Sequence, residues 1–267
     1  MTLTVEKISW RAAIQLSLPK EHGSWSLALE PVAFGLLVAP SAAGGALAVA
    51  ALAGFFLRRP LRLALRGRAD ARQVEPLILS LLVLATLALG GLLLAAKFGG
   101  VEKLWPLLPA VLAGLVFVWA DSRNEAREGM AEVAGAVAFG LLPAALAALA
   151  GWNVNQSLAL TAMSLTRSVP TVLTVRTCLR LAKGKEFSAT PSVVAVVIGI
   201  VLMAWLAALH LAPWVAVVFA VFFALRTMWL LLWRPQITAR KIGITEAVLG
   251  GLLVLVLALT WKSTGGW

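Results

Sequence analysis

The sequence predicts an all-α fold, a polytopic membrane helix bundle of about nine transmembrane helices with its N-terminus in the cytoplasm. Hydrophobic residues make up 61% of the 267 residues and charged residues only 13%, and the mean hydropathy is +0.92. A soluble domain needs more polar surface than this. Nearly uncharged runs long enough to cross a bilayer recur along the chain, so we expect a single integral membrane domain over residues 1–267.

Each predicted span is an apolar run that ends near a glycine, a proline or a charged residue, where an interrupted backbone hydrogen bond costs least. Residues 1–22 are expected to form a cytoplasmic amphipathic segment that leads into the first span. The spans are predicted near residues 23–39, 42–57, 76–96, 105–120, 131–150, 156–179, 190–210, 213–233 and 244–261.

The orientation follows from the distribution of Lys and Arg. With the N-terminus inside, 20 of the 23 cationic residues fall on the inner side, and Lys97, Lys103 and Lys262 fall on the outer side. This asymmetry obeys the positive-inside rule. It also explains the net charge of +11 without a nucleic-acid partner. Tryptophans near span ends, Trp261 among them, are expected in the interfacial belt.

The stretch after the second predicted span is rich in arginine and begins with Arg58, Arg59 and Pro60. Arginines at this position bind a phosphate group or the anionic leaflet, or they serve only to orient the chain. Arg58 and Arg59 are the candidates for substrate binding because they lie closest to the predicted bundle.

Four carboxylates follow the fourth predicted span. Asp121, Glu125, Glu128 and Glu132 are spaced so that a helix would place them on one face. Such a stripe repels itself unless a cation meets it, and a divalent metal such as Mg²⁺ is one candidate. Arginines of neighbouring helices, or a solvated helical loop, are the alternatives.

The sixth predicted span contains arginine at membrane depth. Arg167 lies nine residues before Arg176, or about 14 Å along a helix. Arg226 is similarly placed in the eighth span. A guanidinium at that depth normally faces a polar interior that supplies a partner, so all three arginines are candidates for substrate binding. Arg167 also shares a polar stripe with Ser164, Thr171, Thr174 and Cys178.

Buried arginines require acids, and three glutamates lie in the same inner half of the predicted spans. We therefore expect Glu30, Glu132 and Glu246 to meet Arg167 and Arg226 in one polar cavity. A structural ion-pair core would use the same residues, so both interpretations stay open.

His22 lies at the start of the first predicted span, four residues before Ser26 and eight before Glu30, so all three share one helix face. This spacing places a titratable imidazole above a buried carboxylate. His22 and Glu30 are therefore the candidate catalytic residues, with His22 as general base, proton shuttle or ligand. An amphipathic segment whose histidine merely bonds a loop is the alternative.

The stretches "PKEHGSWSLALEPVAFGLL", "RRPL" and "RSVPTVLTVR" resemble the YwiC-like family of bacterial integral membrane proteins. The resemblance implies a multi-pass protein of the bacterial cytoplasmic (inner) membrane, and the family carries no assigned activity. The architecture is also similar to that of the UbiA-like intramembrane prenyltransferases. Those enzymes hold magnesium and a diphosphate on aspartate-rich loops after spans 2 and 6, which this chain does not have.

Three functions remain, and whether the chain is an enzyme stays open. The first is a UbiA-like membrane enzyme that acts on a phosphorylated or isoprenoid lipid from the cytoplasmic side. The second is a transporter or permease for a small anion that uses the buried arginines. The third is a membrane assembly or scaffold protein. The bilayer is the expected partner, with an anionic or phosphorylated lipid as a candidate ligand; the sequence does not define an oligomeric state.

Overall fold

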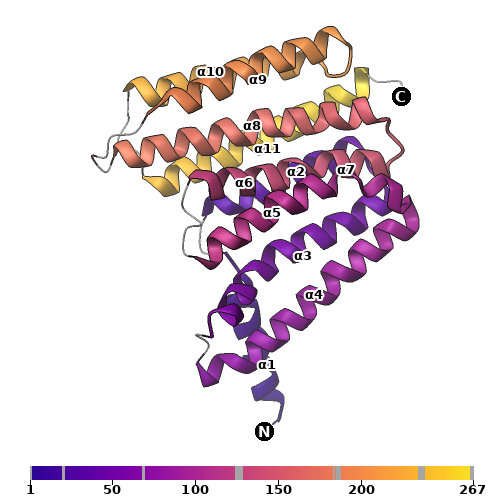
Figure 1. The fold of residues 1–267 in the computed structure, drawn as a ribbon, viewed down its shortest axis with the longest axis vertical. Coiled ribbons are helices and arrows are strands. Elements are labelled where there is room, and N and C mark those ends of the chain that lie inside the picture. Colours follow the sequence, from indigo (N-terminus) through magenta and orange to yellow (C-terminus); the bar gives the residue numbers. More distant parts are fainter. Residues whose placement is uncertain are drawn as a thin grey trace.

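A computed structural model describes residues 2–19, 22–67, 70–123, 129–182, 184, 188–233 and 238–264; the side chains of 2–9, 22–24, 71, 121–122, 129, 239–240 and 262–264 are not described. These ranges fold into helices and contain no strand (Figure 1). The helices are α1 (Thr2–Ser17), α2 (His22–Val38), α3 (Ala42–Leu65), α4 (Ala71–Gly99), the 3-10 helix η1 (Val101–Leu104), α5 (Leu107–Ser122), α6 (Gly129–Gly140), α7 (Leu142–Leu149), α8 (Val154–Leu181), α9 (Thr190–Ala208), α10 (Trp214–Trp233) and α11 (Ala239–Thr264).

The predicted fold class is confirmed. Within the described ranges, seven helices are long and apolar enough to cross a membrane, and two shorter apolar helices lie at Trp25–Val38 and Leu107–Ala120. The count of about nine spans is therefore approximate. Large apolar side chains such as Leu82, Leu225 and Leu259 lie exposed on the outside of the bundle, as expected where lipid replaces water.

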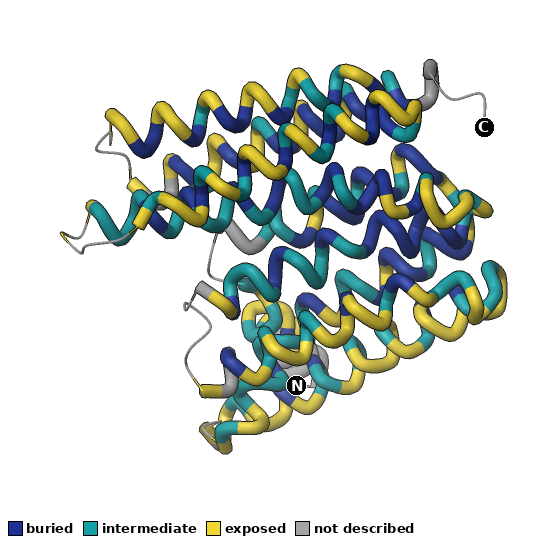
Figure 2. The backbone as a smooth tube through the Cα atoms, turned by 45° about the horizontal axis from the view of Figure 1, so that its top comes forward, coloured by how far each residue is buried: buried dark blue, intermediate teal, exposed yellow. Residues whose placement is uncertain are grey.

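The helices pack side by side (Figure 1). α8 packs against α9, α10, α6 and α7, and α2 packs against α11 and α7. α3 and α4 form a long antiparallel pair, and α1 packs on both at the edge of the bundle. Figure 2 shows that buried residues concentrate between the helices, whereas the outer faces are exposed.

The largest apolar cluster joins α2 to α8, α9, α10 and α11. Leu160, Met163, Met203 and Leu257 are almost fully buried in it. Trp261 belongs to this cluster, is only 3% exposed and meets the Phe34 ring edge-on at 6.0 Å. Trp261 thus packs between helices, and its expected place in the interfacial belt stays a prediction.

The predicted span 131–150 is divided into α6 and α7 at Leu141. Pro143 in the first turn of α7 has no N–H to continue the helical ladder. The Thr161 hydroxyl of α8 donates to the Leu141 carbonyl (3.3 Å) and accepts from the Ala144 N–H (2.9 Å). A side chain from a neighbouring helix thus replaces the backbone bonds that the break removes.

α3 continues eight residues beyond its predicted end at residue 57, so the expected loop at Arg58 and Arg59 is helical. Leu, Ala and Arg are all good helix formers and support this extension. Pro60 is buried within the helix. The arginines are consequently held on a rigid element.

Candidate functional site

α8 carries the polar side chains of the site. It begins at a capping box, in which the Asn153 side chain accepts from the Gln156 N–H and the Gln156 side chain accepts from the Asn153 N–H. Along the buried side of the helix lie seven polar residues, most of them three or four positions apart, namely Ser157, Thr161, Ser164, Arg167, Ser168, Thr174 and Thr177. Thr161, Arg167 and Thr174 of this face bond to groups of neighbouring helices.

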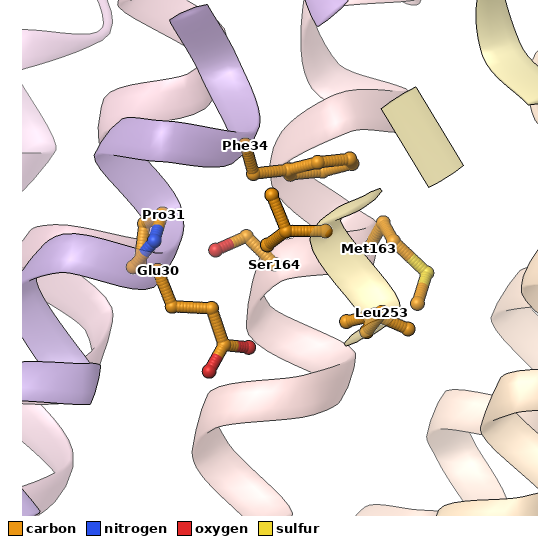
Figure 3. Close-up of a pocket in the computed structure, with 7 residues that line it drawn as sticks. Glu30, Pro31, Phe34, Met163, Ser164 and Leu253 are labelled. Atoms are coloured by element: carbon orange, nitrogen blue, oxygen red, sulfur yellow. The ribbon is translucent and has the colours of Figure 1, made fainter. Parts of the chain in front are cut away.

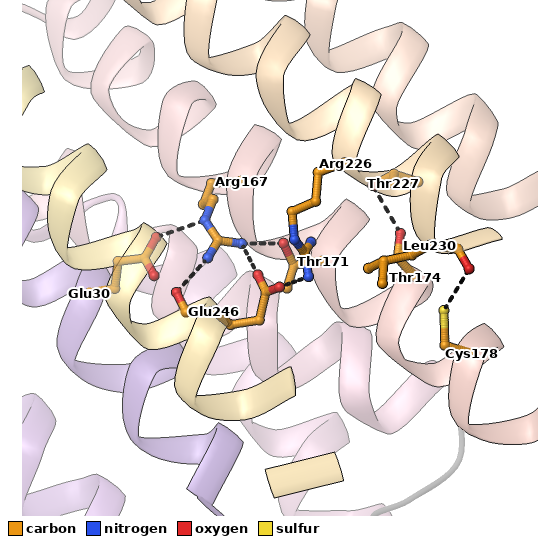
Figure 4. A network of polar contacts seen from close by, with 9 residues as sticks. All are labelled: Glu30, Arg167, Thr171, Thr174, Cys178, Arg226, Thr227, Leu230 and Glu246. Carbon is orange, nitrogen blue, oxygen red and sulfur yellow. Dashed lines mark hydrogen bonds and ion pairs between the residues drawn. The ribbon is translucent and has the colours of Figure 1, made fainter. Parts of the chain in front are cut away.

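Arg167 lies at the centre of the bundle and is 4% exposed. Its Nη1 pairs with Glu246 Oε2 at 3.0 Å and donates to Thr171 Oγ1, while its Nη2 donates to the backbone carbonyl of Glu246 at 3.0 Å. Its Nε lies 3.4 Å from Glu30 Oε1. The guanidinium also lies over the Phe223 ring, 4.4 Å from the centroid. Arg167 is therefore held from α2, α8, α10 and α11 together (Figure 4).

Glu246 of α11 links the two buried arginines. One carboxylate oxygen, Oε2, pairs with Arg167, and the other, Oε1, pairs with Arg226 of α10. We call Glu30, Arg167, Arg226 and Glu246 the charge cluster. Its two positive and two negative groups balance when all are ionised, which offsets much of the cost of removing them from water.

Several contacts in the charge cluster are ion pairs rather than aligned hydrogen bonds. Arg167 Nε and both Glu246 carboxylate oxygens are buried and make no hydrogen bond within the described residues. An ion pair of this kind fixes geometry less strictly than a bidentate hydrogen-bonded fork does.

Glu30 is the member of the charge cluster that faces a cavity. Figure 3 shows Glu30 with five of the residues that line this cavity with it, namely Pro31, Phe34, Met163, Ser164 and Leu253. The cavity volume is about 10 Å³, room for about one water molecule. Of the charged residues predicted to share one polar cavity, Glu30 alone lines this one.

Glu132 and Arg176 form a separate pair. Arg176 Nη1 donates to Glu132 Oε2 at 3.0 Å, between α8 and α6. The Glu132 side chain is 32% exposed, compared with 6% for Glu246. The structure thus places Glu132 beside Arg176, whereas Glu30 and Glu246 pair with Arg167.

Arg58 and Arg59 contact other helices. The Arg58 guanidinium lies over the Phe117 ring of α5, 5.0 Å from its centroid. Arg59 Nη1 donates to the carbonyls of Gln15 (3.0 Å) and Leu18 (2.6 Å) at the end of α1. Both arginines take part in helix packing at α3, and their role in binding a substrate stays a prediction.

The remaining predicted site residues lie outside the described side chains. These are the proposed acid–base residue and three of the proposed metal ligands, namely His22, Asp121, Glu125 and Glu128. Among the residues that are described, no three His, Cys, Asp or Glu side chains lie close enough to hold a metal ion. The Mg²⁺ site therefore stays a prediction.

Two features of the site have only weak signals in the sequence. Gly250 lies one helical turn after Glu246, and a Cβ there would collide with the Glu30 carboxylate. Phe223 lies one turn before Arg226 and covers Arg167 from α10. The signals in the sequence are a glycine four positions after Glu246 and an aromatic residue three positions before Arg226.

The fold and the charge cluster define a polytopic helical membrane protein with ion pairs buried between its spans. A comparison with protein families matches residues 18–147 to the family described as YwiC-like protein. The resemblance found in the sequence is confirmed over this range, which contains the first two of the three stretches that carry it; the third, residues 167–176, lies outside. Neither the curated proteins nor the solved structures include a match, so the likeness to UbiA-like enzymes stays a prediction.

Proposed function

We propose that the protein is a carrier of a small anion and that Arg167 and Arg226 form its binding site. The observation that carries this proposal is the bridging position of Glu246, whose two carboxylate oxygens pair with the two arginines. An internal carboxylate occupies the place where a carboxylate or phosphate ligand would bind.

Charge and depth support this proposal. Ionisable residues inside a membrane protein are costly and commonly mark an ion pathway. The arginine fork matches a carboxylate or phosphate in shape and charge. An entering anion that displaced Glu246 would keep both guanidinium groups paired, so the exchange would leave no buried arginine without a partner.

Glu30 is the proposed proton carrier of the same site. It pairs with Arg167 and lines the small cavity, whereas Glu132 pairs with Arg176 elsewhere. Pro31 follows Glu30 directly in α2, and Pro170 lies three residues after Arg167 in α8. Proline removes one backbone bond of a helix, so both helices have a point at which they can bend beside the charges.

The proposal is tested with the purified full-length protein and four probe anions: inorganic phosphate, sulfate, acetate and succinate. We expect at least one of them to raise the unfolding temperature of the wild type, since a ligand at 100 times its Kd stabilises by about 2.7 kcal/mol. Arg226→Gln, which leaves Glu246 paired with Arg167, is expected to abolish the shift. Arg72→Gln on the exposed start of α4 changes the net charge equally and is expected to retain it.

Flux measurements provide a second test of the carrier proposal. The stabilising anion, as a radioactive tracer, is expected to enter proteoliposomes that contain the wild type faster than protein-free liposomes. If none of the four anions stabilises the protein and none enters faster than in the protein-free control, the carrier proposal is overturned. Buried charges that serve only to join helices would give that result.

An enzyme for a phosphorylated or isoprenoid lipid is the second candidate. The Glu132–Arg176 pair favours it, because it holds one acid of the predicted carboxylate stripe beside an arginine that could meet a phosphate. Under this hypothesis, Mg²⁺ with a short isoprenyl diphosphate stabilises the wild type but not His22→Ala or Glu132→Gln. Equal stabilisation of the wild type and both variants would show that neither residue belongs to the site. If none of the three proteins is stabilised, the enzyme hypothesis is overturned.

A further inference from the structure

We propose that α1, α3 and α4 form a binding site for one anionic phospholipid, with an acyl chain in an apolar groove and the phosphate on Arg59. This inference is independent of the proposed function, since none of the residues that carry it belongs to the charge cluster.

The groove has a volume of about 250 Å³ and lies between the three helices. α1 contributes Trp10, Ile14 and Leu18, which are spaced four residues apart and so share one helix face. Their side chains are 49%, 56% and 39% exposed. Phe56 of α3 and Val83 and Leu84 of α4 form the opposite wall. Hydrocarbon is the occupant that such a surface favours.

The polar groups of the groove are directed toward the backbone. The Ser17 and Ser80 hydroxyls both lie within hydrogen-bond distance of the Ala13 carbonyl, at 2.9 and 3.0 Å. The Ser80 hydroxyl is also 2.7 Å from the Pro76 carbonyl of its own helix. With these hydroxyls engaged, the groove offers an apolar surface to an acyl chain rather than polar groups to a soluble ligand.

Arg59 supplies the polar end of the site. It lies one turn after Phe56 on α3, and its Nη1 donates to the carbonyl of Leu18, a residue of the groove. The bond to Gln15 uses the same nitrogen. A guanidinium has five N–H groups, and those on Nε and Nη2 make no hydrogen bond within the described residues. Arg59 is therefore held in place with donors available for a phosphate.

The local charge favours an anionic headgroup over a zwitterionic one. Arg62 and Arg66 follow Arg59 on α3, and an amphipathic helix beside basic residues is typical of the surface of an anionic leaflet. A neutral detergent could fill the groove, but it would not meet Arg59 with a negative charge. The proposed ligand is thus a phospholipid with a net negative headgroup.

The test uses the full-length protein in detergent and native mass spectrometry with phosphatidylglycerol and phosphatidylcholine of identical acyl chains. We expect the first bound phosphatidylglycerol to show about fivefold higher affinity than phosphatidylcholine, the effect of one arginine near an anionic lipid. Arg59→Gln should remove this preference, whereas Arg72→Gln, an equal change of net charge on exposed α4, should keep it.

A second pair of variants tests the groove and leaves the bonds of Arg59 to α1 unchanged. Val83→Trp places a large side chain inside the groove and should weaken binding of the first phosphatidylglycerol at least fivefold. Leu82→Trp, at a position of α4 that is 63% exposed and does not line the groove, should not. Equal affinity for the two lipids, or equal binding by both variants of either pair, would overturn the proposal.

Discussion

The Glu30 carboxylate of α2 occupies the space beside Gly250 of α11 that a Cβ atom would require. Glu30 also pairs with Arg167 of α8. The missing side chain at position 250 therefore permits the carboxylate to lie between two helices and reach the guanidinium. A glycine, and not only charged residues, determines the shape of the charge cluster.

Gly250→Ala is expected to destabilise the protein by about 1–3 kcal/mol, the range for overpacking a filled interior. The new methyl group must displace the Glu30 carboxylate from Arg167. The measurement is chemical unfolding in detergent. Gly251→Ala is the matched control, because a Cβ at position 251 meets no atom within 4 Å. If both variants unfold alike, the packing of Glu30 against Gly250 does not contribute to stability.

Glu246→Ala is expected to cost about 3–5 kcal/mol, because it leaves Arg167 and Arg226 buried without their shared carboxylate. Glu132→Ala removes one partner of a more exposed pair and should cost at most about 1 kcal/mol. Both are measured by unfolding under identical conditions. A smaller loss for Glu246→Ala than for Glu132→Ala would contradict a central role of Glu246.

Thr161→Val is expected to destabilise the protein by about 1–3 kcal/mol, because it removes the partner of two backbone groups at the α6–α7 break. The comparison is Thr260→Val, whose hydroxyl donates to the carbonyl of Val256 within its own helix. That change should cost less. Unfolding curves that shift equally would show that the break does not depend on Thr161.

The orientation can be tested with an impermeant maleimide applied to intact cells. Cys178 is the only cysteine in the sequence, so Cys178→Ser supplies the background for introduced thiols. Lys97→Cys, on the predicted outer side, should be labelled directly. Arg66→Cys, on the predicted inner side, should be labelled only after the membrane is permeabilised. The reverse pattern would contradict a cytoplasmic N-terminus.

The sequence by itself was sufficient to predict the helical membrane fold and to identify the charged residues that are buried. Membrane helices satisfy their own backbone locally, so apolar runs such as residues 190–210 indicate α9 directly. Arg167 and Arg226 are likewise visible, since a guanidinium in an apolar run is rare at any depth.

Tertiary structure decided which charges meet. Glu30, Glu132 and Glu246 are similar in sequence context, yet two of them join Arg167 and the third pairs with Arg176. Helical periodicity determines which residues share a face of one helix but not which faces of different helices pack together. The division of the predicted span at Leu141, which depends on Thr161 from α8, has the same cause.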